Sequence, residues 1–460
     1  MRAIRGGRCG GRPNFGYVGT TTVTITERDA VRRLMQRVGL GPRPGELDSS
    51  AASSGFDATL AALTVPATGA DAGVAATPAP VFGPAPKRLG KTAPIAARQA
   101  QRREEAEQGR QLVVWWLDRM SAVSTPFPER MTWFWHGHFA TSVKKVHLAQ
   151  LMSLQNDTQR RLGRGDFRTL AQAMIIDPAM LIWLDGGGNR VGRPNENLAR
   201  EFMELFTLGV GNYSETDVRQ AARALTGWQV DYTTDTPVFH PRAHDAGPET
   251  VLGAPGAYTA PRLVDLVITQ PASPRFLAQR VWTRFVADTP PDPTALERLV
   301  TAYGPGHDIT ALLRAAVSSP AFRAPTSVLV REPVLWLVGA LRALRAPASK
   351  LPPAALSAAL TGLGQTPFAP PNVGGWPAGT PWLTTAAAMT RLRVARALAT
   401  VGDISPVTDA PPAARIDATA ALLGLPTLTD RTRTALRTLT SQPAQLLALA
   451  LASPENTVSA

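Results

Sequence analysis

The sequence is poor in cysteine and has no long apolar run. Its 460 residues include one cysteine, Cys9, so neither a disulfide within the chain nor a cysteine-based metal site can form. No stretch of about 18 apolar residues occurs, and a span across a membrane is therefore not expected. The basic start of the chain is not followed by the apolar run of a secretory signal. We expect a cytoplasmic protein, or an exported one if the start site has been misassigned.

Several familiar catalytic motifs are also absent. The sequence has no Walker A motif, no glycine-rich dinucleotide fingerprint after a strand, and no serine nucleophile elbow. The run GGGNR that begins at residue 186 is typical of a turn. The commonest nucleotide-binding and hydrolase functions therefore lack support.

Lysine is scarce, so the positive charge is almost entirely arginine. Lysine and arginine together number 48 against 35 acidic residues, which gives a net charge of +13. Basic proteins often bind nucleic acids, but these arginines are diffuse and mixed with acids, without an aromatic-rich basic patch. We expect a solvated arginine-rich surface and place non-specific nucleic-acid binding third among the candidate functions. The lysines are Lys87, Lys91, Lys144, Lys145 and Lys350.

The apolar residues, 44% of the chain, follow helical spacing over most of its length. We predict a mainly α fold, a large multi-helix domain with a small β-hairpin or flap near residues 228–253. Thr26 is expected to cap the first helix, and a long helix is predicted over residues 95–121. Ser214 and Asp217 have the spacing of a capping box at the start of a later helix.

Changes of composition divide the chain into three predicted parts. Residues 1–25 are predicted to be a disordered or mis-started leader. Residues 26–395 are predicted to form a single helical domain, in which the Pro/Ala/Gly-rich segment 65–94 is a surface loop. Residues 396–460 are predicted to form a C-terminal helical extension that packs on this domain.

Two histidines, His136 and His138, lie in the aromatic segment TWFWHGHF. A helix that continues through this segment would place them on nearly opposite sides, where they cannot bind one metal ion. A helix that ends at Gly137 would allow them to converge, as His-x-His pairs do on extended chain. The simpler alternative is a buried, hydrogen-bonded His138 with His136 on the surface.

The densest polar segment is RPNENLAREFMELF, from residue 193, which predicts a helix with one apolar and one polar face. Glu196 and Arg200, and likewise Arg200 and Glu204, have the spacing of ion pairs on an exposed helix. Alternatively, the polar face looks into a cleft, where Glu201 and Glu204 serve as ligands or a general base and Arg200 as an anion clamp. The residues expected to line such a pocket are Asn195, Glu196, Asn197, Trp228 and Trp376.

Two loop segments complete the candidate chemistry. In FHPRAHDAG, the aspartate is a weak signal by itself, because aspartate commonly closes a turn through its own backbone. The proline- and glycine-rich segment 364–392 is predicted to be a packed loop anchored by Phe368, Trp376 and Trp382, with a substrate-facing lid as the alternative. A divalent metal is predicted if the histidine segments converge, and its candidate ligands are His136, His138, His244 and Asp245.

Several of these segments, in this order, resemble an uncharacterised bacterial family, domain of unknown function 1800. The resemblance covers about residues 26–395 and implies no established activity or catalytic residues. It implies that many relatives are exported and that a neighbouring gene often encodes an uncharacterised protein resembling phosphatases and sulfatases. This sequence departs from that pattern because it lacks a visible export signal. The matching segments include WWLDRM, ERMTWFWHGHFATS, DPAMLIWLDGGGN, PNENLAREFMELFTLGVGNYSETDV, HDAG and PFAPPNVGGWPAG.

Two classes of function remain open at this point. The first is an enzyme with a polar His/Glu/Asn/Arg pocket that carries out metal-assisted hydrolysis on an unknown substrate. The second is a non-catalytic helical binding or scaffold protein, whose partner docks on the tryptophan-bearing loops. The two classes differ in whether His138, Glu201 and His244 converge on one site.

Overall fold

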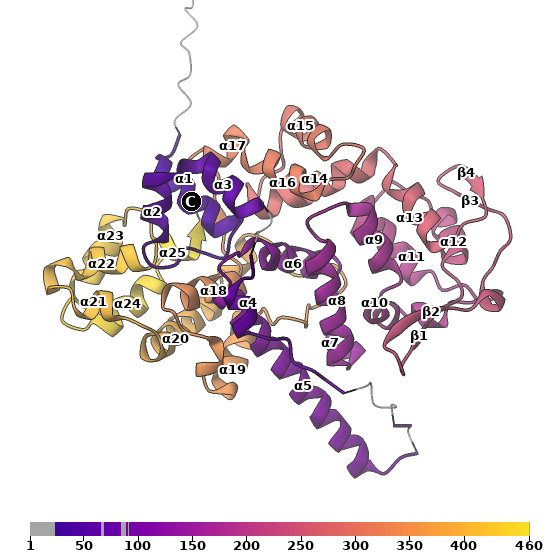
Figure 1. Cartoon of the computed structure of the whole chain (residues 1–460), viewed down its shortest axis with the longest axis horizontal. Helices are drawn as coiled ribbons and strands as arrows, with labels where there is room; N and C mark the ends of the chain where they lie inside the picture. Colours follow the sequence, from indigo (N-terminus) through magenta and orange to yellow (C-terminus); the bar gives the residue numbers. More distant parts are fainter. Residues whose placement is uncertain (1–23, 66–68, 84–88, 91, 460) are drawn as a thin grey trace, which may run out of the picture.

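Helices make up most of the structure (Figure 1). The computed structural model describes residues 24–65, 69–83, 89–90 and 92–459. The predicted mainly α fold is confirmed. None of the described helices is long and apolar enough to cross a membrane. Of the predicted leader, residues 1–23 lie outside the described residues.

The N-terminal helices pack together before one long helix leaves the body. They are α1 (Glu27–Arg37), α2 (Glu46–Ser53), α3 (Gly55–Thr64), α4 (Ala72–Ala76) and α5 (Ile95–Ala122). Thr26 caps α1 as predicted, because its hydroxyl oxygen accepts the backbone N–H of Asp29 at 3.1 Å. The described part of the predicted loop 65–94 is irregular apart from α4. Helix α5 confirms the predicted long helix, and its first half extends away from the body in Figure 1.

The middle of the chain is a series of shorter helices. They are α6 (Phe127–His138), α7 (Val143–Val146), α8 (Ala149–Leu162), α9 (Phe167–Ile175), α10 (Pro178–Trp183), α11 (Asn197–Glu201) and α12 (Glu215–Ala224). A 3₁₀ turn occupies Gly186–Gly188, and a π-helical turn, Phe202–Thr207, follows α11. The predicted capping box of Ser214 and Asp217 is present at the start of α12.

The predicted β flap consists of two small antiparallel hairpins. Strands β1 (Trp228–Asp231) and β2 (Thr236–Phe239) form the first, in which Trp228 lies opposite Phe239. Strands β3 (Glu249–Val251) and β4 (Ala254–Gly256) form the second. A further short pair, β5 (Leu329–Val330) and β6 (Val458–Ser459), joins two distant parts of the chain.

The rest of the chain is again helical. Its helices are α13 (Ala260–Ile268), α14 (Ala272–Phe285), α15 (Pro293–Tyr303), α16 (Ile309–Val317), α17 (Pro320–Arg323), α18 (Pro333–Ala343), α19 (Pro353–Leu363), α20 (Thr385–Val401), α21 (Ser405–Thr408), α22 (Arg415–Leu422), α23 (Asp430–Arg437), α24 (Pro443–Leu451) and α25 (Pro454–Thr457). The predicted boundary at residue 395 falls within α20, which packs against α24. The division into domain and extension stays a prediction.

Helix α6 lies between two hydrophobic cores. Phe134 and Trp135 on one side of α6 belong to a core built mainly from α1, α9 and α13–α16. Trp133 belongs to a second core built mainly from α5 and α18–α24. Because α6 is buried on both sides, side chains one or two positions apart on it enter different environments. This arrangement determines the surroundings of His136 and His138.

The arginine excess is not confined to a solvated surface, as the sequence had led us to expect. Eight arginines of the described chain are buried. Several of them donate hydrogen bonds to backbone carbonyls at the C-terminal ends of other helices, where the last turn leaves carbonyls without intrahelical partners. Arg342 is one example: its side chain donates to Gly41 O at 3.0 Å and to Val123 O at 2.8 Å. The buried arginines are Arg32, Arg33, Arg37, Arg119, Arg130, Arg331, Arg342 and Arg391.

We expect Arg342→Met to lower the free energy of unfolding by about 3 kcal/mol, because it leaves several buried carbonyls without a donor. The exposed Arg103 on α5 supplies the matched control. Arg103→Met should change stability by less than about 0.5 kcal/mol. Urea-induced unfolding followed by circular dichroism measures both values. Equal effects of the two substitutions would show that the carbonyl contacts of Arg342 do not stabilise the fold.

Candidate functional site

His136 is buried, so its predicted surface position is wrong. Its Nε2 accepts the backbone N–H of Phe368 at 2.9 Å. Its ring packs against Trp116 and Trp376, with centroids 5.2 and 5.4 Å away. Burial lowers the pKa of His136 to about 3. The imidazole is therefore neutral and acts as a hydrogen-bond acceptor within an aromatic cluster.

His138 is buried on the other side of α6. Its Nε2 donates to the carbonyl oxygen of Phe206, in the π-helical turn, at 2.9 Å. Since the carbonyl can only accept, Nε2 carries the proton and Nδ1 is left as an acceptor. That Nδ1 atom is buried and has no hydrogen-bond partner among the described residues. Burial, reinforced by the charge of Arg280, lowers the pKa of His138 well below its usual value.

The helix continues through His138, so the two imidazoles diverge. This is the geometry in which His136 and His138 cannot share one metal ion. No group of three or more His, Cys, Asp or Glu side chains that could hold a metal ion occurs in the part of the chain that the structure describes. The divalent metal stays a prediction from the sequence, without a converged ligand set.

The polar face of α11 contains ion pairs near the surface. Arg200 donates to Glu215 at 2.6 Å and to Glu196 at 3.1 Å, and these carboxylates raise its pKa. Glu204 accepts a short hydrogen bond from the hydroxyl of Tyr213. Burial and the neighbouring Glu204 raise the pKa of Glu201. The predicted pair of Glu196 and Arg200 is present, whereas Arg200 pairs with Glu215 in place of Glu204, so two carboxylates already balance its charge.

The two asparagines stabilise the loop before α11. The side chain of Asn195 accepts the backbone N–H of Asn197 at 3.0 Å and donates to Asp185 O at 3.2 Å. The amide of Asn197 donates to Leu184 O at 3.3 Å. Both side chains are therefore occupied by local backbone groups.

His244 and Asp245 belong to the flap. Asp245 forms an ion pair with Arg223 at 2.8 Å and accepts the backbone N–H of Gly247, which closes the turn as the simpler interpretation predicted. The Nδ1 atom of His244 contacts Thr226 Oγ1 at 3.2 Å. Trp228 packs against Phe239 across β1 and β2. The structure gives no contact between this group and His138 or Glu201.

The structure instead brings the HGH segment of α6 against the VGGW segment of the 364–392 loop. Gly375 has a φ of +79°, and a Cβ there would lie 2.1 Å from the carbonyl oxygen of Gly137. Only glycine permits this approach. It places the ring of Trp376 against both Trp133 and His136. The predicted packed loop is confirmed as far as Thr384, since Phe368, Trp376 and Trp382 are all buried, and residues 385–392 of the segment form the start of α20.

A small cavity lies where this loop, α6 and α14 meet, and we call it the arginine pocket. Its volume is about 20 Å³, and a second cavity of about 40 Å³ shares three of its charged residues. Arg284 pairs with Glu332 at 2.7 Å and also donates to Trp376 O at 2.7 Å. The lining of the arginine pocket includes Arg130, Arg280, Arg284, Glu332, His138 and Trp376.

The cationic side chains of the arginine pocket differ in how well they are paired. Arg130 donates to Arg37 O at 2.9 Å, whereas Nε of Arg280 is buried without a hydrogen-bond partner among the described residues. Burial lowers the pKa of each of these two guanidinium groups to about 10. Burial raises the pKa of Glu332, but the charges of Arg284 and Arg130 and the hydrogen bonds from Trp133 and Gln365 outweigh burial, so that the pKa is lowered and the carboxyl stays charged.

Sequence patterns single out His138 and Trp376 of this pocket but not its arginines. The sequence of α14 does contain a pattern that points to two of these arginines. Arg280 and Arg284 are like charges four residues apart, a spacing that destabilises a helix. The flanking Leu277 and Val281 are buried. Two cations at this spacing, beside apolar positions, indicate a helix face turned toward an acidic partner or an anion.

The buried histidines predict acid sensitivity. The unfolded imidazole has a pKa of about 6.5, so below this pH the unfolded state binds more protons and stability falls as the pH falls. For His136, the effect extends from pH about 6.5 down to about 3. We expect His136→Gln to reduce the pH slope of the unfolding free energy by up to about 1.4 kcal/mol per pH unit.

Urea unfolding at a series of pH values from neutral to acidic measures this slope. His240→Gln, at an exposed histidine, is the control and should leave the slope of the parent protein unchanged. Parallel pH curves for His136→Gln and the parent would contradict the burial of a neutral imidazole at this position.

Comparison with known proteins gives one match. A family model described as a protein of unknown function (DUF1800) matches residues 33–458. No curated protein and no solved structure matches the chain. The matched range contains α6, α14 and the 364–392 loop, and therefore every residue named in the arginine pocket. The chain belongs to the DUF1800 family of proteins of unknown function.

Proposed function

We propose that this protein binds a small oxyanion, or a substrate through its carboxylate, phosphate or sulfate group, in the arginine pocket. The observation that carries the proposal is a cavity lined by His138 and Arg280, each of which has a buried nitrogen without a hydrogen-bond partner among the described residues. Buried polar groups in native proteins are normally satisfied. A bound oxyanion would accept the hydrogen bond that Nε of Arg280 lacks, and an oxyanion that carries a proton would also donate to Nδ1 of His138.

The charge of the pocket supports an anion. Three guanidinium groups, of Arg130, Arg280 and Arg284, face a single carboxylate, that of Glu332. The neutral His138 adds no charge. Burying unpaired positive charge is costly unless an anion compensates it, and guanidinium groups bind oxyanions with two parallel hydrogen bonds.

The same charge argues against a metal ion in the arginine pocket, since three cations would repel it and Glu332 is already bound by three donors. A protonated oxygen of the ligand would provide the donor that Nδ1 of His138 needs. Hydrolytic chemistry on the bound group, with or without a metal, stays a prediction from the sequence.

The volume of the pocket sets a requirement for binding. About 20 Å³ holds roughly one water molecule, so a four-oxygen anion needs side chains to move. Arg280 is partly exposed and has no hydrogen bond from Nε, which makes it the side chain that moves at least cost. The adjoining cavity, which shares Arg130, Arg284 and Glu332, offers the space into which the pocket expands.

Sulfate, phosphate and acetate titrations test the proposal, with sodium chloride at matched ionic strength as the reference. We expect at least one oxyanion to raise the melting temperature saturably and to give a measurable Kd by calorimetry. Arg280→Gln should weaken that Kd at least tenfold, about 1.4 kcal/mol. Arg275→Gln, at an exposed arginine of the same helix that pairs with Glu297, should not.

The stability of the free variants separates a binding role from a structural one. Without ligand, Arg280→Gln should melt at or above the temperature of the parent protein, because it removes a poorly paired cation whose Nε is buried. Two results together would overturn the proposal. One is an Arg280→Gln variant that is less stable than the parent protein. The other is an equal response of Arg280→Gln and Arg275→Gln to sulfate, phosphate and chloride.

A further inference from the structure

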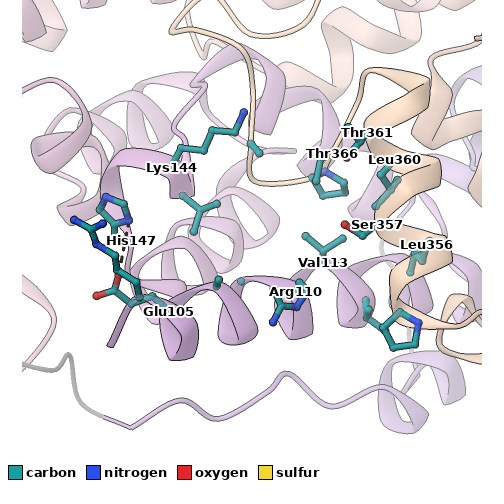
Figure 2. Close-up of a pocket in the computed structure, with 18 residues that line it drawn as sticks. Glu105, Arg110, Val113, Lys144, His147, Leu356, Ser357, Leu360, Thr361 and Thr366 are labelled. Atoms are coloured by element: carbon teal, nitrogen blue, oxygen red, sulfur yellow. Dashed lines mark ion pairs between the residues drawn. The ribbon is translucent and has the colours of Figure 1, made fainter. Parts of the chain in front are cut away.

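A second and larger cavity lies along the protruding helix α5, and we call it the α5 groove. Its volume is about 490 Å³, within the range of small-molecule sites, about 300–1,000 Å³. Its walls come from α5, α7, α19 and the start of the 364–392 loop, as Figure 2 shows. It shares no lining residue with the arginine pocket.

The groove is apolar along most of its length. Figure 2 shows Val113 of α5 near Leu360 of α19, and Val143 of α7 also lines the groove. Leu356 extends the apolar surface toward one end of the groove, where the hydroxyl of Ser357 also lies. A surface of this kind favours a hydrocarbon chain over a polar ligand.

The opposite end of the groove is charged. Figure 2 places Lys144 and His147 at the end away from Leu356. Nδ1 of His147 lies 3.8 Å from Oε2 of Glu105, so the carboxylate at this end of the groove already has a basic partner. Arg102 adds a further cation to the lining. The groove is therefore apolar at one end and basic at the other, the complement of a molecule with an apolar tail and an anionic head.

A glycine within α5 keeps the groove open. Gly109 lies in the interior of a 28-residue helix, where glycine costs about 1 kcal/mol relative to alanine. A Cβ at this position would meet nothing closer than Val143 Cγ2 at 3.8 Å, so close packing does not require glycine. Gly109 lines the groove, and a larger side chain would fill it.

From these observations we propose that the α5 groove binds a medium-chain fatty acid. Its carboxylate lies beside Lys144 and Arg102, and its hydrocarbon chain passes Gly109 and Val113 toward Leu360. The proposal is independent of the oxyanion proposed for the arginine pocket, because the two cavities have separate linings. The charge complementarity of the basic end favours the fatty acid over a neutral lipid.

Calorimetric titration of the full chain with octanoate, decanoate and dodecanoate, each below its micelle concentration, tests the proposal. We expect one site per chain and an affinity that rises about fourfold for each added methylene until the groove is full. Dodecanol, which has the tail without the carboxylate, should bind at least tenfold more weakly than dodecanoate.

Two pairs of variants connect this binding to the groove. Gly109→Leu should abolish binding of dodecanoate while the helix stays folded, since leucine is a better helix former than glycine. Gln108→Leu, a neighbouring position of α5 that does not line the groove, should leave the affinity unchanged. Lys144→Gln should weaken binding about tenfold, whereas Lys145→Gln, whose ammonium pairs with Asp185 outside the groove, should not.

Three results would overturn the proposal. One is the absence of saturable dodecanoate binding by a folded parent protein. Another is equal binding by Gly109→Leu and Gln108→Leu. A third is a concentration-dependent dimer that Gly109→Leu disrupts in the absence of fatty acid, which would assign the groove to a second copy of the chain. None of these results bears on sulfate or phosphate binding at Arg280.

Discussion

Hydrogen bonds from buried arginines to the C-terminal carbonyls of other helices hold this fold together. Arg37 on α1 donates to the carbonyl oxygen of Val286, just beyond α14, and to that of Ser327. Arg130 on α6 in turn donates to the carbonyl of Arg37, the last residue of α1. The bonds to the carbonyls of Val286 and Arg37 satisfy groups that a helix end leaves free and place a positive charge at the negative end of a helix dipole. A guanidinium group with five donors can join several chain segments at once, which a lysine cannot do with the same geometry.

The candidate oxyanion site is distinguished by the absence of this pairing. Arg130 contributes to the arginine pocket but is anchored by carbonyls, and Arg284 is anchored by Glu332 and Trp376. Arg280 has no comparable anchor for its Nε, and it lies beside a histidine whose Nδ1 is also without a partner. Other described side chains, such as those of Arg33 and Arg391, also have buried nitrogens without a hydrogen-bond partner, but Arg280 and His138 line the same cavity, and unpaired polar groups beside a cavity are expected at binding sites. The α5 groove, in contrast, is not defined by unpaired polar groups. It is open because Gly109 has no side chain and because α5 extends outward from the body.

Local features of the fold were predictable from the sequence, while the contacts between distant segments were not. The Thr26 cap, the Ser214 capping box and the long helix α5 depend on spacings within a few residues, and all three are confirmed. His136 was placed on the surface because one helix normally has one buried face, whereas α6 is buried on both sides by two cores. Asp245 was identified as a turn residue, but its ion-pair partner Arg223 lies 22 positions away and carries no local signal.

The sequence by itself determined where the helices and hairpins form, because capping, apolar spacing and turn chemistry act over a few residues. It also determined that His138 lies in an aromatic segment and that Trp376 lies in a segment rich in proline and glycine. Only the tertiary structure decided that these segments meet, through the backbone contact of Gly137 with Gly375, and that Arg280 of α14 completes the pocket between them. The physical reason is that burial changes the role of a charged side chain. An arginine that pairs with solvent on a surface becomes, between two cores, a link between helix ends or, as we propose for Arg280, a site for an anion.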